Sequence, residues 1–137
     1  MRYLIIVLSV LVLAACSETI MLSKPEGGTA ATGTLKFRPT PPHRLTVALD
    51  GKNYDGDMDC KEVHENDVHM RERFGANSKH YQAIFSGLNT THRVHHYKGT
   101  LKAPDGATLA CEYLSSNEGG TLGACEDGKG KTYEVHK

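Results

Sequence analysis

The sequence predicts an all-β domain, mainly antiparallel, folded as a small sandwich or barrel of about seven short strands. Residues 44–50 carry the clearest strand pattern, because Leu45, Val47 and Leu49 alternate with polar or smaller side chains. A period of two is typical of a strand with one buried face. Asp-Gly pairs that favour tight turns recur along the chain at 50–51, 55–56, 105–106 and 127–128. Turn signals at intervals of about 8–12 residues indicate a sandwich or a barrel.

The other strands are expected at further extended runs. Residues 33–37 open the domain, and prolines interrupt the chain before residues 44–50. The extended pattern resumes over 52–60. Later strands are expected at five runs: 81–85, 93–102, 108–114, 121–125 and 131–136.

Residues 61–79 break the strand pattern. Val63, Met70 and Phe74 share one helical face, but Asn66 and Asp67 between them are polar. A frayed helix and a long polar loop fit this pattern equally well. We therefore expect an irregular or short helical insertion around 61–79.

The N-terminus has the parts of a secretory signal. Arg2 precedes an apolar run over 3–15 that only Ser9 interrupts, shorter than the roughly 20 apolar residues of a membrane-spanning helix. The run ends in a Leu-Ala-Ala-Cys sequence that resembles the lipobox of bacterial lipoproteins. The resemblance implies that 1–15 is a cleaved signal peptide. It also implies that Cys16 becomes the first residue, acylated by a diacylglyceryl thioether and an N-linked chain such as palmitate. The rival interpretation is an ordinary signal peptide that leaves Cys16 as a free thiol.

The lipoprotein resemblance also predicts a location. Ser17 follows Cys16, whereas Asp at this position tends to retain such lipoproteins in the inner membrane. We therefore expect a cell-envelope protein that is lipid-anchored in the outer membrane of a Gram-negative bacterium. Residues 16–32 contain Pro25, Gly27, Gly28 and several small residues without periodicity. We interpret them as the lipidated Cys and a flexible tether, followed by a single β domain over 33–137.

Composition limits the number of domains and the kind of partner. Removal of the first 15 of 137 residues leaves 122, enough for one domain. Of the 16 basic residues Arg2 leaves with the signal, so 15 basic residues stand against 16 acidic ones. A nearly neutral chain without long runs of like charge does not suit nucleic acid, and we expect none as a partner.

Three cysteines remain after Cys16, in a compartment where disulfides persist: Cys60, Cys111 and Cys125. Of the three possible pairings we favour Cys111–Cys125. These residues flank a polar, Gly-rich loop, so a hairpin would place them opposite each other. A disulfide that closes a loop of about 15 residues adds roughly 3 kcal/mol to the free energy of unfolding. Cys60 is then left as a buried, inert thiol or as a reactive or dimer-forming one.

The densest histidine group is His92, His95 and His96. On a helix these three would share a face and offer ligands to Zn²⁺ or Cu²⁺. The flanking residues look extended, however, and on a strand only His92 and His96 share a face, about 13 Å apart. The three histidines are therefore weak metal candidates, and we expect no metal site.

Other motifs fail on spacing. A His-Glu pair at 64–65 followed by His69 has one residue too many for a zinc-protease helix. An Asp-x-Asp-x-Asp run over 55–59 begins like a calcium loop but has Cys60 where that loop needs Gly. A nucleophile elbow, a phosphate loop and a dinucleotide fingerprint are absent from the sequence. We therefore expect no enzyme and no cofactor.

Two stretches resemble a group of small uncharacterised lipoproteins of proteobacteria. The C-terminal stretch has Asp-Gly at 105–106, Cys-Glu-Tyr at 111–113 and a Gly-x-Cys-x-Asp-x-x-Gly-x-x-Tyr signature over 123–133. The earlier stretch covers 31–35 and 45–56. The resemblance implies a lipid anchor, a β fold and a bridge between Cys111 and Cys125. It supplies no catalytic residue.

These observations lead to three hypotheses. The first is a non-enzymatic lipoprotein, held to the membrane through Cys16, that has a structural role or binds a protein or another envelope component. The second is periplasmic metal binding or sensing through the histidines. The third is an inhibitor of a hydrolase such as lysozyme, which rests on an analogy of general plan.

Overall fold

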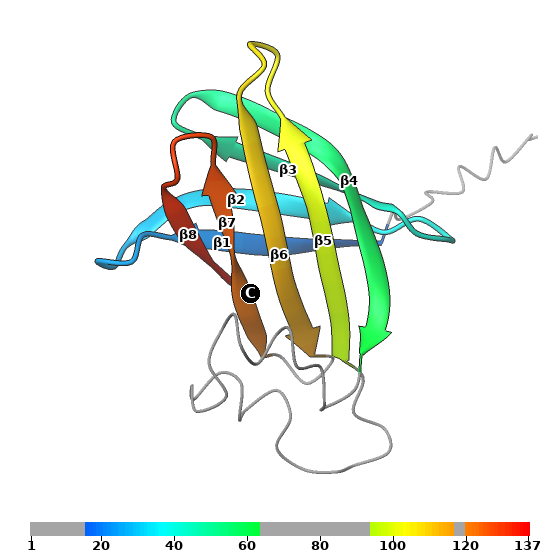
Figure 1. The fold of residues 1–137 in the computed structure, drawn as a ribbon. Coiled ribbons are helices and arrows are strands. Elements are labelled where there is room, and N and C mark those ends of the chain that lie inside the picture. The colour runs from blue at the N-terminus through cyan, green and yellow to red at the C-terminus, as the bar shows by residue number, and fades with distance from the viewer. Residues whose placement is uncertain (1–15, 64–93, 117–119) are drawn as a thin grey trace, which may run out of the picture.

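The computed structural model describes residues 16–63, 94–116 and 120–137, and all regular elements in these residues are strands. They are drawn in Figure 1: β1 (Ser17–Ser23), β2 (Thr29–Lys36), β3 (His43–Leu49), β4 (Lys52–Val63), β5 (Val94–Lys102), β6 (Thr108–Ser116), β7 (Thr121–Asp127) and β8 (Thr132–His136). Each strand pairs antiparallel with the next, and β8 pairs with β1, which closes the sheet into a barrel. The predicted all-β, antiparallel small barrel is confirmed, with eight strands instead of about seven. Within the described ranges, no helix is long and apolar enough to cross a membrane.

The prediction of a flexible tether over 16–32 is wrong, because most of these residues form strands. β1 pairs with β2 from Ser17↔Lys36 to Ser23↔Thr29. Ile20 and Leu22 are fully buried in the barrel, whereas Met21 between them is exposed. This short alternation is hard to recognise because the turn that follows it carries a proline and two glycines.

The insertion expected around 61–79 is partly replaced by a strand. β4 continues through Val63, so the first residues of that stretch are extended. Residues 64–79, and the strand predicted at 81–85, lie outside the described residues. The remaining predicted runs coincide with strands that differ only at their ends.

The predicted disulfide is confirmed. Cys111 on β6 and Cys125 on β7 are direct partners in the ladder, with a Cα–Cα distance of 4.0 Å, and they form a disulfide bond. Both side chains point into the barrel, where they are 2% and 0% exposed. The bond therefore lies within the hydrophobic core.

The two ends of the barrel differ. Tight connections at 24–28, 50–51, 103–107 and 128–131 gather at one end, which we call the turn end. The other end, which we call the Cys16 end, carries Cys16, loop 37–42, the end of β4, the start of β5, the β6–β7 connection and the C-terminus. The polar part of the barrel interior lies at the Cys16 end.

Candidate binding site

Five side chains that point inward near the Cys16 end form a group that we call the polar cluster: His43, Cys60, His95, Tyr97 and Tyr113. Strand register brings them together from four strands. Cys60 on β4 is the ladder partner of Tyr97 on β5, and Tyr97 is in turn the partner of Tyr113 on β6. Side chains at partnered positions point to the same face of a sheet, so these three meet inside the barrel.

Tyr97 is the centre of the polar cluster. Its ring stacks on the ring of Tyr113 with 5.0 Å between centroids. The rings of His43 and His95 each lie 6.4 Å from it. Its hydroxyl and the Cys60 thiol share a hydrogen bond. The cluster is therefore aromatic in shape and carries hydrogen-bonding atoms at its edges.

His43 is held as a neutral imidazole. The backbone N–H of Arg38 donates to Nδ1 of His43 at 3.1 Å, which makes Nδ1 an acceptor and places the ring proton on Nε2. Burial lowers the pKa of His43, and the nearby charges of Arg38 and His95 lower it further. Phe37 contacts the same ring edge-on at 5.1 Å and helps to fix its orientation.

Burial also disfavours the charged forms of the thiol and of the two phenols in the cluster. Burial raises the pKa of the Cys60 thiol, and the hydrogen bond with Tyr97 opposes only part of that rise. Burial also raises the pKa of Tyr97 and of Tyr113 far above the usual tyrosine value. A protonated thiol is a poor nucleophile, so the geometry does not activate Cys60 for covalent catalysis.

The hydroxyl of Tyr113 is buried and has no hydrogen-bond partner. The residue is only 1% exposed, so bulk water does not solvate this oxygen. A buried polar group without a partner costs about 1–3 kcal/mol. Such a group beside Tyr97 and Cys60 indicates an unfilled hydrogen-bonding position in the cluster.

Glu18 and Lys137 form an ion pair beside the cluster. The Nζ of Lys137 lies 2.8 Å from Oε1 of Glu18, and both side chains are about one-quarter exposed, at 26% and 24%. The same ammonium lies 3.3 Å from the carbonyl oxygen of Ser116. The pair links the first strand to the C-terminal residue at the rim of the barrel.

Of the three weak metal candidates, the two that the structure describes point to opposite faces of the sheet. His95 points into the barrel and belongs to the polar cluster, whereas His96 points outward and its Nε2 lies 3.0 Å from Oε1 of Glu112. His92 lies outside the described residues. Among the residues that the structure describes, no group of three or more His, Cys, Asp or Glu side chains is placed to hold a metal ion.

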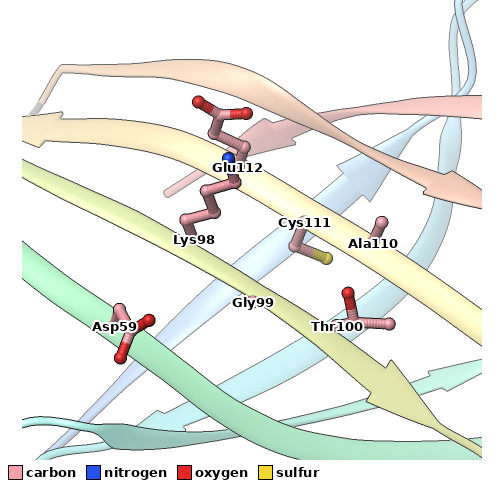
Figure 2. A pocket seen from close by; sticks show the side chains of 7 residues that line it. All are labelled: Asp59, Lys98, Gly99, Thr100, Ala110, Cys111 and Glu112. Atoms are coloured by element: carbon pink, nitrogen blue, oxygen red, sulfur yellow. The ribbon is translucent and has the colours of Figure 1, made fainter.

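A concave region lies on the outer wall over β4, β5 and β6. Figure 2 shows its lining residues, and its volume is about 310 Å³. It is lined by Asp59, Lys98, Gly99, Thr100, Ala110, Cys111 and Glu112. Small residues at 99 and 110 leave the wall thin there, and the charges around it have mixed sign. Because nothing in it selects one ligand chemistry, the polar cluster is the stronger candidate.

Sequence reasoning singled out Cys60 and His95 but not the rest of the cluster. His43 belongs to the period-two series of β3, whereas the burial patterns of β5 around Tyr97 and of β6 around Tyr113 do not alternate simply. Their convergence depends on the register of four strands. The sequence alone does not specify that register.

In comparisons with protein-family models, curated proteins and solved structures, the chain matches none. The resemblance to small proteobacterial lipoproteins therefore stays a prediction.

Proposed function

We propose that this chain is a lipoprotein of the Gram-negative envelope, anchored in the outer membrane through acylated Cys16, that binds an envelope component without catalysing a reaction. The binding site in this proposal is the polar cluster. The observation that carries it is the buried, unpartnered hydroxyl of Tyr113 beside the Tyr97 ring. A ligand that supplies the missing hydrogen bond would remove a cost of about 1–3 kcal/mol.

The charge state of the cluster favours binding over catalysis. General acid–base chemistry needs a group whose pKa lies near the working pH. Burial instead moves His43, Cys60 and Tyr113 away from that range, each toward its neutral form. Neutral donors and acceptors at these three residues, on a closed barrel, are suited to recognition.

The same chemistry defines the ligand class. Stacked tyrosine rings offer flat apolar surface, and the Tyr113 hydroxyl and the His43 Nε2–H offer neutral hydrogen bonds. A charged ligand would lose its hydration without gaining an opposite charge from His43, Tyr97 or Tyr113. We therefore propose a neutral hydroxyl or amide group of a cell-wall component as the part that is bound.

The test uses Cys60 as a reporter. In the acylated protein Cys60 is the free thiol among the described residues, because Cys16 carries lipid and Cys111 is bonded to Cys125. The rate at which N-ethylmaleimide alkylates Cys60 is measured in detergent at pH 8.5, with and without soluble muropeptides. Bound muropeptide should slow alkylation several-fold in the wild type, and Tyr113→Phe should abolish the slowing.

Tyr133→Phe is the matched control. Tyr133 is also 1% exposed and also carries an unpartnered hydroxyl, but it lies on β8 beside the disulfide. This variant should keep the muropeptide effect. Unchanged alkylation in the wild type, or equal loss of the effect in both variants, would contradict the proposal.

Native mass spectrometry of the same protein tests the alternative function, which is metal binding. Purification without chelator or metal-affinity resin keeps any bound ion. A stoichiometric ion that survives desalting, and is lost in His43→Gln and His95→Gln, would replace the proposed function by metal handling.

A further inference from the structure

We infer that the corner of the barrel formed by Cys16 and loop 37–42 rests directly on the lipid surface. This inference depends on the acylation of Cys16 in the proposed function and goes beyond it. It concerns how the barrel is held, and which of its faces is next to the bilayer.

The first argument is the absence of a spacer. β1 begins at Ser17, the residue after Cys16. The carbonyl oxygen of Cys16 accepts a hydrogen bond from the N–H of Phe37 at 2.9 Å, so the backbone of Cys16 is already fixed to the end of β2. One residue spans at most about 3.6 Å, and none is left between the lipidated position and the folded sheet. The barrel therefore stays within headgroup distance of the acyl chains.

The second argument is the chemistry of the corner. Pro39, Thr40 and Pro41 are exposed beside Cys16. Arg38 is also exposed, and its guanidinium lies 3.4 Å from Asp57, while Arg44 pairs with Asp55 and Asp57. These two arginines balance the two aspartates, so apart from Lys36 the corner has little net charge and the covalent anchor sets the contact. Lys36 adds an exposed cation that suits anionic headgroups.

The opposite side of the barrel provides the reference position. β1 has seven residues and spans about 23 Å at the usual rise of a strand. It leads to the turn at 24–28, which lies on the far side of the barrel from loop 37–42 (Figure 1). Glu26 lies in this turn and is exposed. Because the turn is on the far side of the barrel from loop 37–42, we expect position 26 to lie away from the bilayer.

The experiment compares these two positions in the full acylated protein. Thr40→Cys and Glu26→Cys are each made in a Cys60→Ser background and labelled with one fluorophore. The proteins are reconstituted into vesicles of phosphatidylethanolamine and phosphatidylglycerol that contain lipids with a nitroxide on the headgroup. The label at 40 should be quenched at least three-fold more than the label at 26. Equal quenching would overturn the inference.

An insertion variant tests whether the contact depends on the short connection between the anchor and the barrel. Ten Gly-Ser residues placed between Cys16 and Ser17 should bring the two quenching values close together, because the barrel then moves freely above the surface. Persistent preference for position 40 after insertion would mean that loop 37–42 binds lipid by itself, which would overturn the argument from the missing spacer.

The mass of the purified protein reports acylation. A protein without acyl mass overturns the anchor and the contact together, whereas an acylated protein with equal quenching overturns the contact alone.

Discussion

Tyr113 illustrates how a single atom can indicate function. Its hydroxyl is buried without a partner, and the stacked ring of Tyr97 restricts where it can turn. We expect Tyr113→Phe to leave the free energy of unfolding unchanged or to raise it by about 1 kcal/mol, because an unsatisfied polar group is removed at constant shape. Urea denaturation measures this change. A loss of more than about 1 kcal/mol would mean that the hydroxyl already has a partner in the folded protein.

His43 gives the barrel a pH-dependent stability. Its pKa is lowered from the ordinary value of 6.5 in the folded protein, so the unfolded chain binds the proton more readily. Stability is therefore intact above about pH 6.5 and falls as the pH is lowered toward the folded-state pKa. We expect His43→Gln to lose less stability than the wild type between pH 7.5 and pH 5.5, as measured by urea midpoints. Equal losses in the two proteins would contradict the assignment of this proton uptake to His43.

At the scale of the strands, Gly99 controls how closely β4 and β5 approach. The β4–β5 ladder passes from Asp55↔Lys102 to Asp59↔Lys98 without regular pairs between them. A Cβ on Gly99 would collide with the carbonyl oxygen of Asp57 and would lie 2.7 Å from the sulfur of Met58. Only a residue without a side chain allows this approach.

We therefore expect Gly99→Ala to lower the free energy of unfolding by about 1–3 kcal/mol, as measured by urea denaturation, because the added atom overpacks the wall. Gly128→Ala is the matched control. A Cβ there would meet only Thr108 Oγ1, at 3.5 Å, which is ordinary contact. Its effect should stay within about 0.5 kcal/mol. A similar loss in both variants would contradict the assignment of the loss to the close approach at Gly99.

The β6–β7 hairpin is held by the Cys111–Cys125 bond, which closes a loop with a sequence separation of 14. Replacing both cysteines by alanine should lower the free energy of unfolding by about 3 kcal/mol through the greater freedom of the unfolded chain. Thermal unfolding followed by circular dichroism checks this value. If the free energy of unfolding falls by less than about 1 kcal/mol, native packing and residual structure in the unfolded chain offset the entropy gained by opening the loop.

The strands show which local features a sequence can predict. The period of two in residues 44–50 predicted β3, because that strand buries one face. β1 was missed because its alternation is short and is followed by Pro25, Gly27 and Gly28. β6 has no simple alternation either, since Glu112–Ser116 are all buried. Its assignment rested on its apolar composition and the loop that follows.

At the scale of the whole molecule, closure depends on the last strand. β8 pairs with both β7 and β1, so it removes the two open edges that the sheet would otherwise have. Deletion of residues 132–137 should therefore give a protein that aggregates, because the exposed edges of β7 and β1 pair with other chains. Size-exclusion chromatography measures the outcome. Deletion of Lys137 alone, which removes the partly exposed pair with Glu18 and the contact with the Ser116 carbonyl oxygen but leaves β8 in place, should leave a monomer.

Neither the closure of the barrel nor the polar cluster could be predicted from the sequence, and the reason is the same for both. Turn spacing predicts an antiparallel β fold, but a sandwich and a barrel differ only in whether the first and last strands pair. The cluster likewise depends on how His43, Cys60, Tyr97 and Tyr113 are aligned across four strands. Both properties arise from long-range register, which no local pattern records.

The inward position of the disulfide imposes an order on the maturation of this protein. Cys111 and Cys125 belong to a hairpin that precedes β8 in the chain, and their sulfurs are enclosed once β8 pairs with β1. An oxidant or an isomerase can reach them only while the chain is open. Oxidation of the hairpin therefore comes before barrel closure, and a chain that closes with reduced cysteines must unfold before it can be repaired.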